Sequence, residues 1–159
     1  MPRRADGASL ERELDRLYGL PPGEFTPARN DLARELKRSG DAAGADRVQE
    51  LKKPSRAAGA INRAARGNRR DVKRLLDAAA KLGEAQEQLL QGGGRRGIQQ
   101  AVERERAAVD KLMAAVEAEL ERERGASEAM LGRARGTLHA VATDPDLRTE
   151  LEAGRVSED

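Results

Sequence analysis

The sequence predicts an all-α protein, with a small helical bundle at the N-terminal end followed by a long antiparallel helical hairpin. Alanine, leucine, glutamate, arginine and lysine, which favour helix most strongly, dominate the composition. Apolar residues recur at spacings of three and four, and no stretch shows the alternation that is typical of a strand. Glycine, proline and capping residues interrupt this pattern at intervals that predict seven to eight helices.

Each expected helix is bounded by such signals. The expected helices cover residues 9–19, 26–40, 41–52, 55–66, 68–91, 96–124, 127–142 and 145–154. Thr26 and Pro27 are expected to be the N-cap and the first helical position of the second helix, with Phe25 as a hydrophobic staple. Asp41 and Asp144 are expected to cap the third and the last helix. Asn68, followed three residues later by Asp71, predicts a cap at the start of the fifth helix.

Three regions follow from these breaks. Residues 1–67 form a basic N-terminal helical region, and residues 68–124 form the long hairpin with a flexible hinge at Gly92–Gly94. Residues 125–159 form short C-terminal helices and a tail, Arg155–Asp159, that we expect to be disordered. We find no internal repeat of solenoid period.

The longest helix shows part of a coiled-coil pattern. Its apolar residues at heptad positions a and d are Ile98, Val102, Val109, Leu112 and Val116. Glu105 and Glu119 occupy the other d positions, which weakens the pattern. The glutamate runs 103–105 and 117–123, to which these two residues belong, alternate with arginines, as is typical of a solvated helix surface or of pairing with another charged helix.

The core predicted by this composition is thin. Hydrophobic residues make up 38% of the chain, but 28 of the 159 residues are alanine, and leucine, isoleucine, valine and phenylalanine together supply 28. Their share, about 18%, lies below the roughly 20% at which independent folding becomes doubtful. The net charge is only +2, whereas disordered chains usually combine low hydrophobicity with high net charge. We therefore expect folded helices of marginal stability, and a partner or self-association that supplies part of the burial.

Charge is distributed unevenly along the chain. Residues 1–80 carry a net charge of +6 and residues 81–159 a net charge of −4. The excess is greatest from Arg47 to Arg74, where ten basic residues stand against two acidic ones. Such a stretch predicts contact with nucleic-acid phosphates or, alternatively, a solvated surface that pairs with the acidic half. The candidate phosphate-binding residues are Lys52, Lys53, Arg56, Arg63, Arg66, Arg69, Arg70, Lys73 and Arg74.

A helix-turn-helix is a weaker alternative for the second and third helices, with Gly40 in the turn. The third helix is rich in alanine and offers only Arg47, Gln49 and Lys52 to read bases. The buried or exposed state of Asn62, which lies among small residues, stays open at this point.

No pattern indicates catalysis, a cofactor or a metal site. The chain has no cysteine, so thiolate nucleophiles, thiolate metal sites and disulfides are excluded. His139 is the single histidine, and no Glu-x-x-His motif accompanies the glutamate runs. The glycines at 92–94 lack the Gly-Lys-Ser/Thr ending of a phosphate loop. We therefore expect a protein that is not an enzyme and that has no cofactor, metal ion or small-molecule substrate.

Several short motifs resemble those of an uncharacterised protein family that is common in actinobacteria. The residues that carry the resemblance are Leu17-Tyr18, Leu20-Pro21, Glu24-Phe25, Arg29, Leu32-Ala33, Gly40-Asp41, Leu51–Ser55, Ala57-Ala58 and Asn62, with a weaker match over Ala140–Arg155. No activity is established for that family, so the resemblance implies a helical fold and a source but no function.

Two functions remain in competition. The first is a non-enzymatic helical interaction protein that binds a protein partner or a second copy of itself. The alternative is a nucleic-acid-associated protein that contacts duplex DNA or structured RNA through residues 47–74; the near absence of aromatic residues opposes single-strand binding by stacking. No run of apolar residues predicts a membrane span, and the charged start Met1–Asp6 lacks the apolar region of an export signal, so we expect a cytoplasmic protein.

Overall fold

The computed structural model describes residues 7–159, and the charged start Met1–Asp6, on which the absence of an export signal was judged, lies outside them. The described residues form eight α-helices and no strand, which confirms the predicted all-α fold. The helices are α1 (Gly7–Tyr18), α2 (Pro22–Arg38), α3 (Ala42–Gln49), α4 (Arg56–Gly67), α5 (Arg69–Leu90), α6 (Arg95–Glu123), α7 (Glu128–Ala140) and α8 (Pro145–Ala153).

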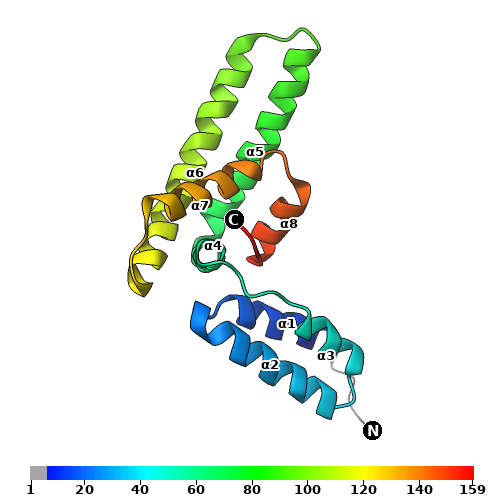
Figure 1. The fold of residues 1–159 in the computed structure, drawn as a ribbon. Coiled ribbons are helices and arrows are strands. Elements are labelled where there is room, and N and C mark those ends of the chain that lie inside the picture. Colours follow the sequence, from blue (N-terminus) through cyan, green and yellow to red (C-terminus); the bar gives the residue numbers. More distant parts are fainter. Residues whose placement is uncertain (1–6) are drawn as a thin grey trace.

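Helices α1–α3 form a small N-terminal unit at one end of the molecule (Figure 1). The leucine stripe of α1 is buried there, with Leu10 and Leu14 packed against Leu36 of α2 and Val48 of α3. A second small cluster places Phe25 against Tyr18, with the two ring centroids 5.4 Å apart in an edge-to-face arrangement. These two small clusters of buried side chains hold the three short helices together.

The start of α2 differs from the prediction. The helix begins at Pro22 and not at Thr26, and Pro27 lies inside it. Proline at the first helical position loses no hydrogen bond and has a suitable φ, so Pro22 can open the helix. Pro27 then forgoes one hydrogen bond, to the carbonyl of Gly23. Phe25 therefore lies within the first turn of α2, where it is buried with 2% of its surface exposed, and it does not act as a hydrophobic staple before a cap.

Helix α4 lies at the centre of the larger body, which also contains α7, α8 and the adjoining parts of α5 and α6 (Figure 1). Its alanines and Ile61 are at most 2% exposed. Small side chains let the neighbouring backbones approach closely, so this helix packs within the body although the sequence grouped it with the N-terminal region. Ser55 caps it by accepting a hydrogen bond from the Ala58 amide at 3.0 Å.

Asn68 does not cap α5 as predicted. Its side chain makes no cap hydrogen bond and instead donates to the Ala64 carbonyl at 2.9 Å. A helix leaves its last carbonyls without partners, and Asn68 satisfies one of those of α4. The predicted caps Asp41 and Asp144 do accept backbone hydrogen bonds at the starts of α3 and α8.

Helices α5 and α6 form the predicted long antiparallel hairpin (Figure 1). The turn falls at the predicted glycines, and Gly92 adopts a φ of +88°, which favours glycine. The lower part of the hairpin packs into the body, where Leu75, Leu112 and Val116 are fully buried. Within the described residues 83–100, which we call the arm, no side chain is buried, and the arm projects away from the body (Figure 1).

The tail expected to be disordered is held in place over Arg155–Ser157. Val156 is fully buried in the core of the body, and Ser157 accepts a hydrogen bond from the Ser55 amide at 3.2 Å. Gly154 ends α8 with a φ of +67° and turns the chain back across α4. The prediction was wrong because the partners of the tail lie about a hundred residues earlier in the chain, beyond the range of any local pattern.

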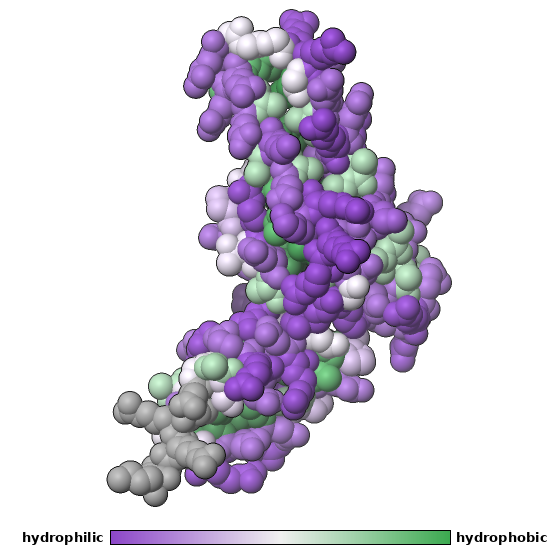
Figure 2. Space-filling view, turned by 180° about the vertical axis from the view of Figure 1, so that it is seen from behind, coloured by the Kyte–Doolittle hydropathy of each residue, from purple (hydrophilic) through white to green (hydrophobic). Residues whose placement is uncertain are grey.

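Charged and polar side chains cover most of the face seen in Figure 2, with small hydrophobic areas between them along the hairpin. None of the described helices is long and apolar enough to cross a membrane. Leu90, near the tip of the arm, is a large hydrophobic residue with 88% of its surface exposed.

Candidate functional site

The predicted basic residues of α4 face the protein itself. Arg63 contacts the carboxylates of Glu119, at 3.4 Å, and Glu123, and its side chain is only 13% exposed. Arg56 lies 3.3 Å from Glu123 and donates to the Gly125 carbonyl at 3.0 Å. Burial lowers the pKa of Arg63, and the charge of Glu119 opposes this shift. Both arginines therefore join α4 to the C-terminal end of α6.

Arg66 and Arg69 hold the end of α8. Arg66 donates to the Gly154 carbonyl at 3.2 Å, and Arg69 donates to the Glu152 carbonyl at 2.8 Å. Cationic side chains suit this position because the last carbonyls of a helix lack partners and carry partial negative charge. Arg66 is half-buried, and burial lowers its pKa. These contacts fix the end of α8 against α4 and the start of α5.

The remaining predicted residues are exposed, and they are Lys52, Lys53, Arg70, Lys73 and Arg74. Lys73 and Arg74 pair with carboxylates of their own helix, Asp77 at 3.0 Å and Asp71 at 3.2 Å. Because both cations are exposed in these pairs, they remain accessible to other anions. The structure therefore divides the basic stretch into residues that stabilise the fold and residues that face solvent, and it does not gather all nine on one surface.

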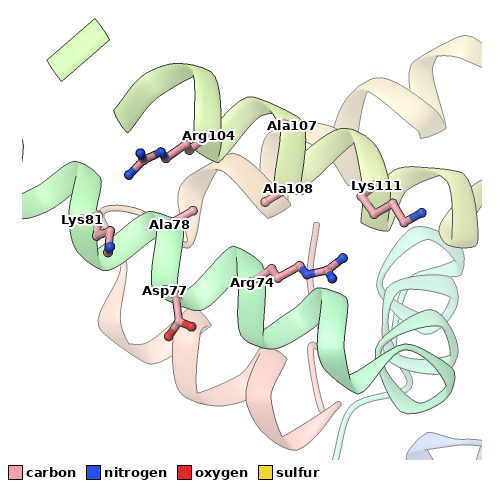
Figure 3. A pocket seen from close by; sticks show the side chains of 8 residues that line it. All are labelled: Arg74, Asp77, Ala78, Lys81, Arg104, Ala107, Ala108 and Lys111. Carbon is pink, nitrogen blue, oxygen red and sulfur yellow. The ribbon is translucent and has the colours of Figure 1, made fainter. Parts of the chain in front are cut away.

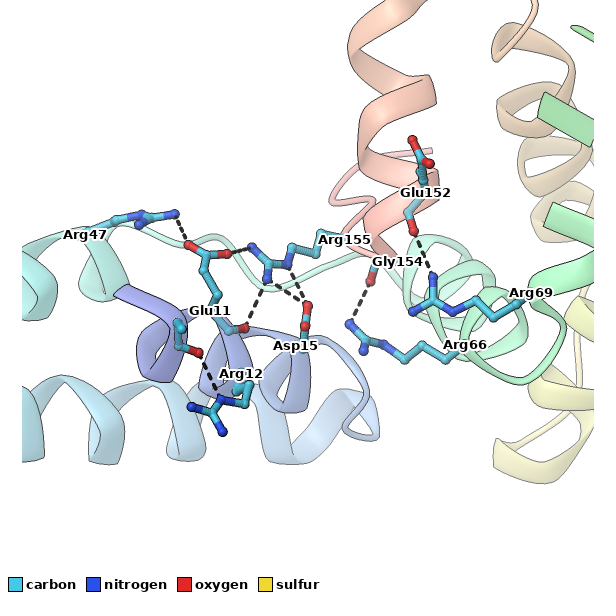
Figure 4. A network of polar contacts seen from close by, with 10 residues as sticks. Glu11, Arg12, Asp15, Arg47, Arg66, Arg69, Glu152, Gly154 and Arg155 are labelled. Carbon is cyan, nitrogen blue, oxygen red and sulfur yellow. Dashed lines mark hydrogen bonds and ion pairs between the residues drawn. The ribbon is translucent and has the colours of Figure 1, made fainter. Parts of the chain in front are cut away.

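Arg155, which the sequence placed in a disordered tail, joins the C-terminal residues to the N-terminal unit (Figure 4). Its guanidinium donates to Glu11 at 2.8 Å and to Asp15 at 2.7 Å, both on α1. Burial would lower the pKa of Arg155, but the hydrogen bonds to the two carboxylates raise it overall. Arg47, one of the residues that the helix-turn-helix alternative offers to DNA bases, pairs with the other oxygen of Glu11 at 3.0 Å.

Asn62 is a buried structural residue, which resolves the alternative that the sequence left open. It is fully buried, donates to the Val156 carbonyl at 2.8 Å and accepts from the Val156 amide at 2.7 Å. A two-bond pairing of this kind satisfies both backbone groups of a buried residue outside any helix. Asn62 therefore explains why the tail can bury Val156.

His139 pairs with a carboxylate that the sequence placed in a solvated pattern. Its Nδ1 lies 2.8 Å from Glu105, whose side chain is 5% exposed beneath α7. Glu105 interrupts the heptad pattern as expected, but it is buried in the packing of α6 against α7 rather than exposed. Among the described residues no group of three or more histidine, aspartate or glutamate side chains has the geometry of a metal site.

A shallow groove lies between α5 and α6 just below the arm (Figure 3) and is the candidate binding surface. It has a volume of about 530 Å³. Its floor consists of alanines, and its rims carry the basic residues. The residues that line it are Arg74, Asp77, Ala78, Lys81, Arg104, Ala107, Ala108 and Lys111.

The four basic residues of the groove stand at its corners. Arg74 and Lys81 are seven residues apart on α5, and Arg104 and Lys111 are seven apart on α6. At 1.5 Å per residue, each pair spans about 10 Å along its helix. Because the helices are antiparallel, Arg104 lies at the Lys81 end and Lys111 lies at the Arg74 end (Figure 3). The groove thus presents a small apolar floor between two basic ends.

Sequence analysis found one residue of this groove, Arg74, and missed the other three cations. The signal was present, because both helices repeat a basic residue after seven positions with alanine four positions after the first. The repeat was overlooked because Lys81 lies outside the basic stretch and because Arg104 and Lys111 lie in the acidic half of the chain. No family model, curated protein or solved structure matches this chain.

Proposed function

We propose that this protein is a non-enzymatic helical interaction protein that binds a protein partner through the α5–α6 hairpin. The observation that carries the proposal is the arm. Two helices extend over the described residues 83–100 without burying one side chain, so the arm contributes little to the core of its own chain. Isolated helices in water are marginal, and most helical stability in proteins comes from packing against other elements. A partner that covers the arm supplies that packing.

The exposed apolar residues of the hairpin support this function. Leu90 is 88% exposed near the tip, and Leu89 and Ile98 remain partly exposed close by. Most other leucines of the chain are buried or partly buried. Apolar side chains that face solvent on a projecting element are typical of interaction sites. His139, by contrast, is engaged within the body, where it pairs with Glu105.

Site-specific cross-linking in cells that make the protein naturally tests this proposal. A photo-reactive residue replaces Leu90 on the arm or Ala107 in the groove, and a matched control replaces the exposed Lys37 of α2. We expect discrete protein adducts from the two hairpin positions and none from position 37. An adduct of twice the mass of the chain identifies a second copy as the partner. Equal labelling from all three positions, or no protein adduct from the hairpin, overturns the proposal.

Contact with nucleic-acid phosphates is the second candidate function. It is supported by the exposed cations of α5, Arg70, Lys73 and Arg74, which continue into the basic rims of the groove. Such binding neutralises phosphates and releases counterions, so it weakens steeply as salt increases. Titration of labelled duplex DNA and structured RNA at two salt concentrations measures it. Binding that is unchanged when Arg70 and Arg74 are replaced by alanine excludes this surface.

A further inference from the structure

We infer that the groove between α5 and α6 binds an acidic α-helical segment of a partner protein, with carboxylates seven residues apart at its two ends and small residues between them. This inference rests on the proposed function and names the chemistry of the partner. The first observation is the shape of the site, which is an open groove between two helices and not an enclosed cavity (Figure 3). A third helix can lie along such a channel because helices pack through ridges that enter the grooves of their neighbours.

The floor of the groove determines what can lie in it. Ala78 and Ala108 lie between the two helices and Ala107 lines the groove beside them, so another helix can approach closely if its own facing side chains are also small. The central contact is therefore apolar. A nucleic-acid backbone would bring charged phosphates and sugars onto this alanine floor and would leave the apolar surface without apolar contact. The floor thus favours a peptide over nucleic acid.

The corners determine the charge of the partner. Lys81 and Arg104 form one basic end, and Arg74 and Lys111 form the other, about 10 Å further along the helices. A helix that carries acidic residues at positions i and i+7 places one carboxylate at each end, and its residues i+3 and i+4 then face the floor. Arginine and lysine at an interface steer an oppositely charged partner and fix its position.

The acidic residue of the groove does not oppose this arrangement. Asp77 lies on the rim, and its carboxylate is bound by Lys73, one turn earlier in α5, at 3.0 Å. Arg74 pairs with Asp71 of its own helix at 3.2 Å, but the Arg74 side chain is 68% exposed and can also contact an incoming carboxylate. The four corners therefore act together as a basic site.

A pair of designed peptides tests the inference on the full chain. The acidic peptide is a labelled helix of repeating Glu-Gln-Gln-Ala-Ala-Gln-Gln units, which places carboxylates seven residues apart with alanines between them. The control peptide has lysine in place of each glutamate. Fluorescence anisotropy measures binding at low and at near-physiological salt. We expect the acidic peptide to bind with an affinity that falls as salt increases, and the lysine peptide not to bind.

Two matched charge-reversal variants locate the binding. The variant K81E/R104E reverses one end of the groove, and the control K37E/R38E makes the same change of charge on exposed residues of α2. We expect at least about tenfold weaker binding of the acidic peptide to K81E/R104E, because two attractions become repulsions. The control variant should bind within about twofold of the parent. Circular dichroism of both variants verifies that the fold is kept.

The outcomes separate this inference from the proposed function. If the acidic peptide fails to bind, or binds both variants equally, the groove does not recognise acidic helices and the inference is overturned. The proposed function still stands in that case if cross-links from Leu90 capture a protein. If duplex nucleic acid binds the groove in place of the peptide and K81E/R104E abolishes it, the groove is a phosphate site and the inference is likewise overturned.

Discussion

The base of the hairpin and its arm belong to the same two helices, but they use their residues in opposite ways. At the base, Leu75, Leu112 and Val116 are fully buried among residues of α4 and α7. In the arm, which covers the described residues 83–100, no side chain is buried, and Leu90 is almost fully exposed. Helical periodicity continues through both parts, so it indicates that a helix forms but not what covers its apolar face.

The charged residues show the same difference. In the body, Arg63 binds the carboxylates of Glu119 and Glu123. Arg66 binds the C-terminal end of α8, and Arg155 binds α1. In the groove, Lys81 and Lys111 stand exposed around an alanine floor. Chemically similar side chains therefore stabilise the fold in one region and remain available to a partner in the other. The contrast predicts that substitutions in the body, including the base of the hairpin, reduce stability, whereas those in the arm and the groove reduce binding.

The largest expected effect compares two leucines of the hairpin. Replacement of Leu112 by alanine removes a fully buried side chain and leaves a cavity, so we expect a loss of about 3 kcal/mol in the free energy of unfolding. Replacement of Leu90 by alanine should change it by less than about 0.5 kcal/mol. Urea unfolding followed by circular dichroism measures both. Losses of equal size would show that the arm is packed in solution, either against its own chain or against a second copy.

Asn62 provides a second test of how buried polar contacts stabilise the body. Its replacement by alanine leaves the buried amide and carbonyl of Val156 without partners, so we expect a loss of about 2 kcal/mol in the free energy of unfolding. Asn68→Ala is the control, because it removes one partly exposed hydrogen bond at the end of α4 and should cost clearly less. Hydrogen exchange of residues 155–157 should increase in the Asn62 variant. Unchanged protection there would contradict the role given to Asn62.

Arg63 and Lys81 compare the two uses of positive charge directly. Arg63→Ala removes the least exposed cation beside Glu119 and Glu123, so we expect a loss of about 1.5 kcal/mol in the free energy of unfolding. The two carboxylates then keep only the more exposed Arg122 and Arg56 as partners. Lys81→Ala should change stability by less than about 0.5 kcal/mol, because its side chain is exposed. The same urea titrations at low and high salt measure both variants. A comparable loss for Lys81 would show that the groove is part of the stabilising network.

The sequence predicted well what local interactions decide. The all-α class, the eight helices, the glycine turn at 92–94 and the caps Asp41 and Asp144 follow from propensity, periodicity and side chains that bond within a few residues. The predicted start of α2 was wrong because both Pro22 and Pro27 can occupy the first position of a helix, and local rules do not decide between them.

Contacts between distant residues could not be predicted in this way. Arg155 binds Glu11 and Asp15 about 140 residues away, and Asn62 binds Val156 across a separation of 94 residues. Similarly, Arg56 to Arg74 form one basic run in sequence, but helix α4 turns its arginines toward α6 and α8. The groove brings together Lys81 and Arg104 from halves of opposite net charge, which no count of charge along the chain reveals.

We expect the smallest change in stability from Glu150, which lies near other carboxylates of the body just as the cations of the groove lie near one another. Burial raises the pKa of Glu150 above its ordinary value of 4.5, and the neighbouring Asp144, Asp146 and Glu158 raise it further. The folded protein thus keeps the Glu150 proton to a higher pH than the unfolded chain does. The stabilisation that this proton gives is present at low pH and is lost as the pH rises through the folded-state pKa.

Replacement of Glu150 by glutamine should therefore raise stability at pH 7, by less than about 0.5 kcal/mol because solvent screens the partly exposed group. The gain should shrink as the pH falls below the raised pKa, since the parent carboxyl is then protonated and resembles the amide. Urea midpoints of the parent and the variant at pH 7 and pH 4 measure this difference. A gain that is the same at both pH values would mean that packing and not charge produces it. In that case the repulsion among these carboxylates would not lower the free energy of unfolding of the body measurably.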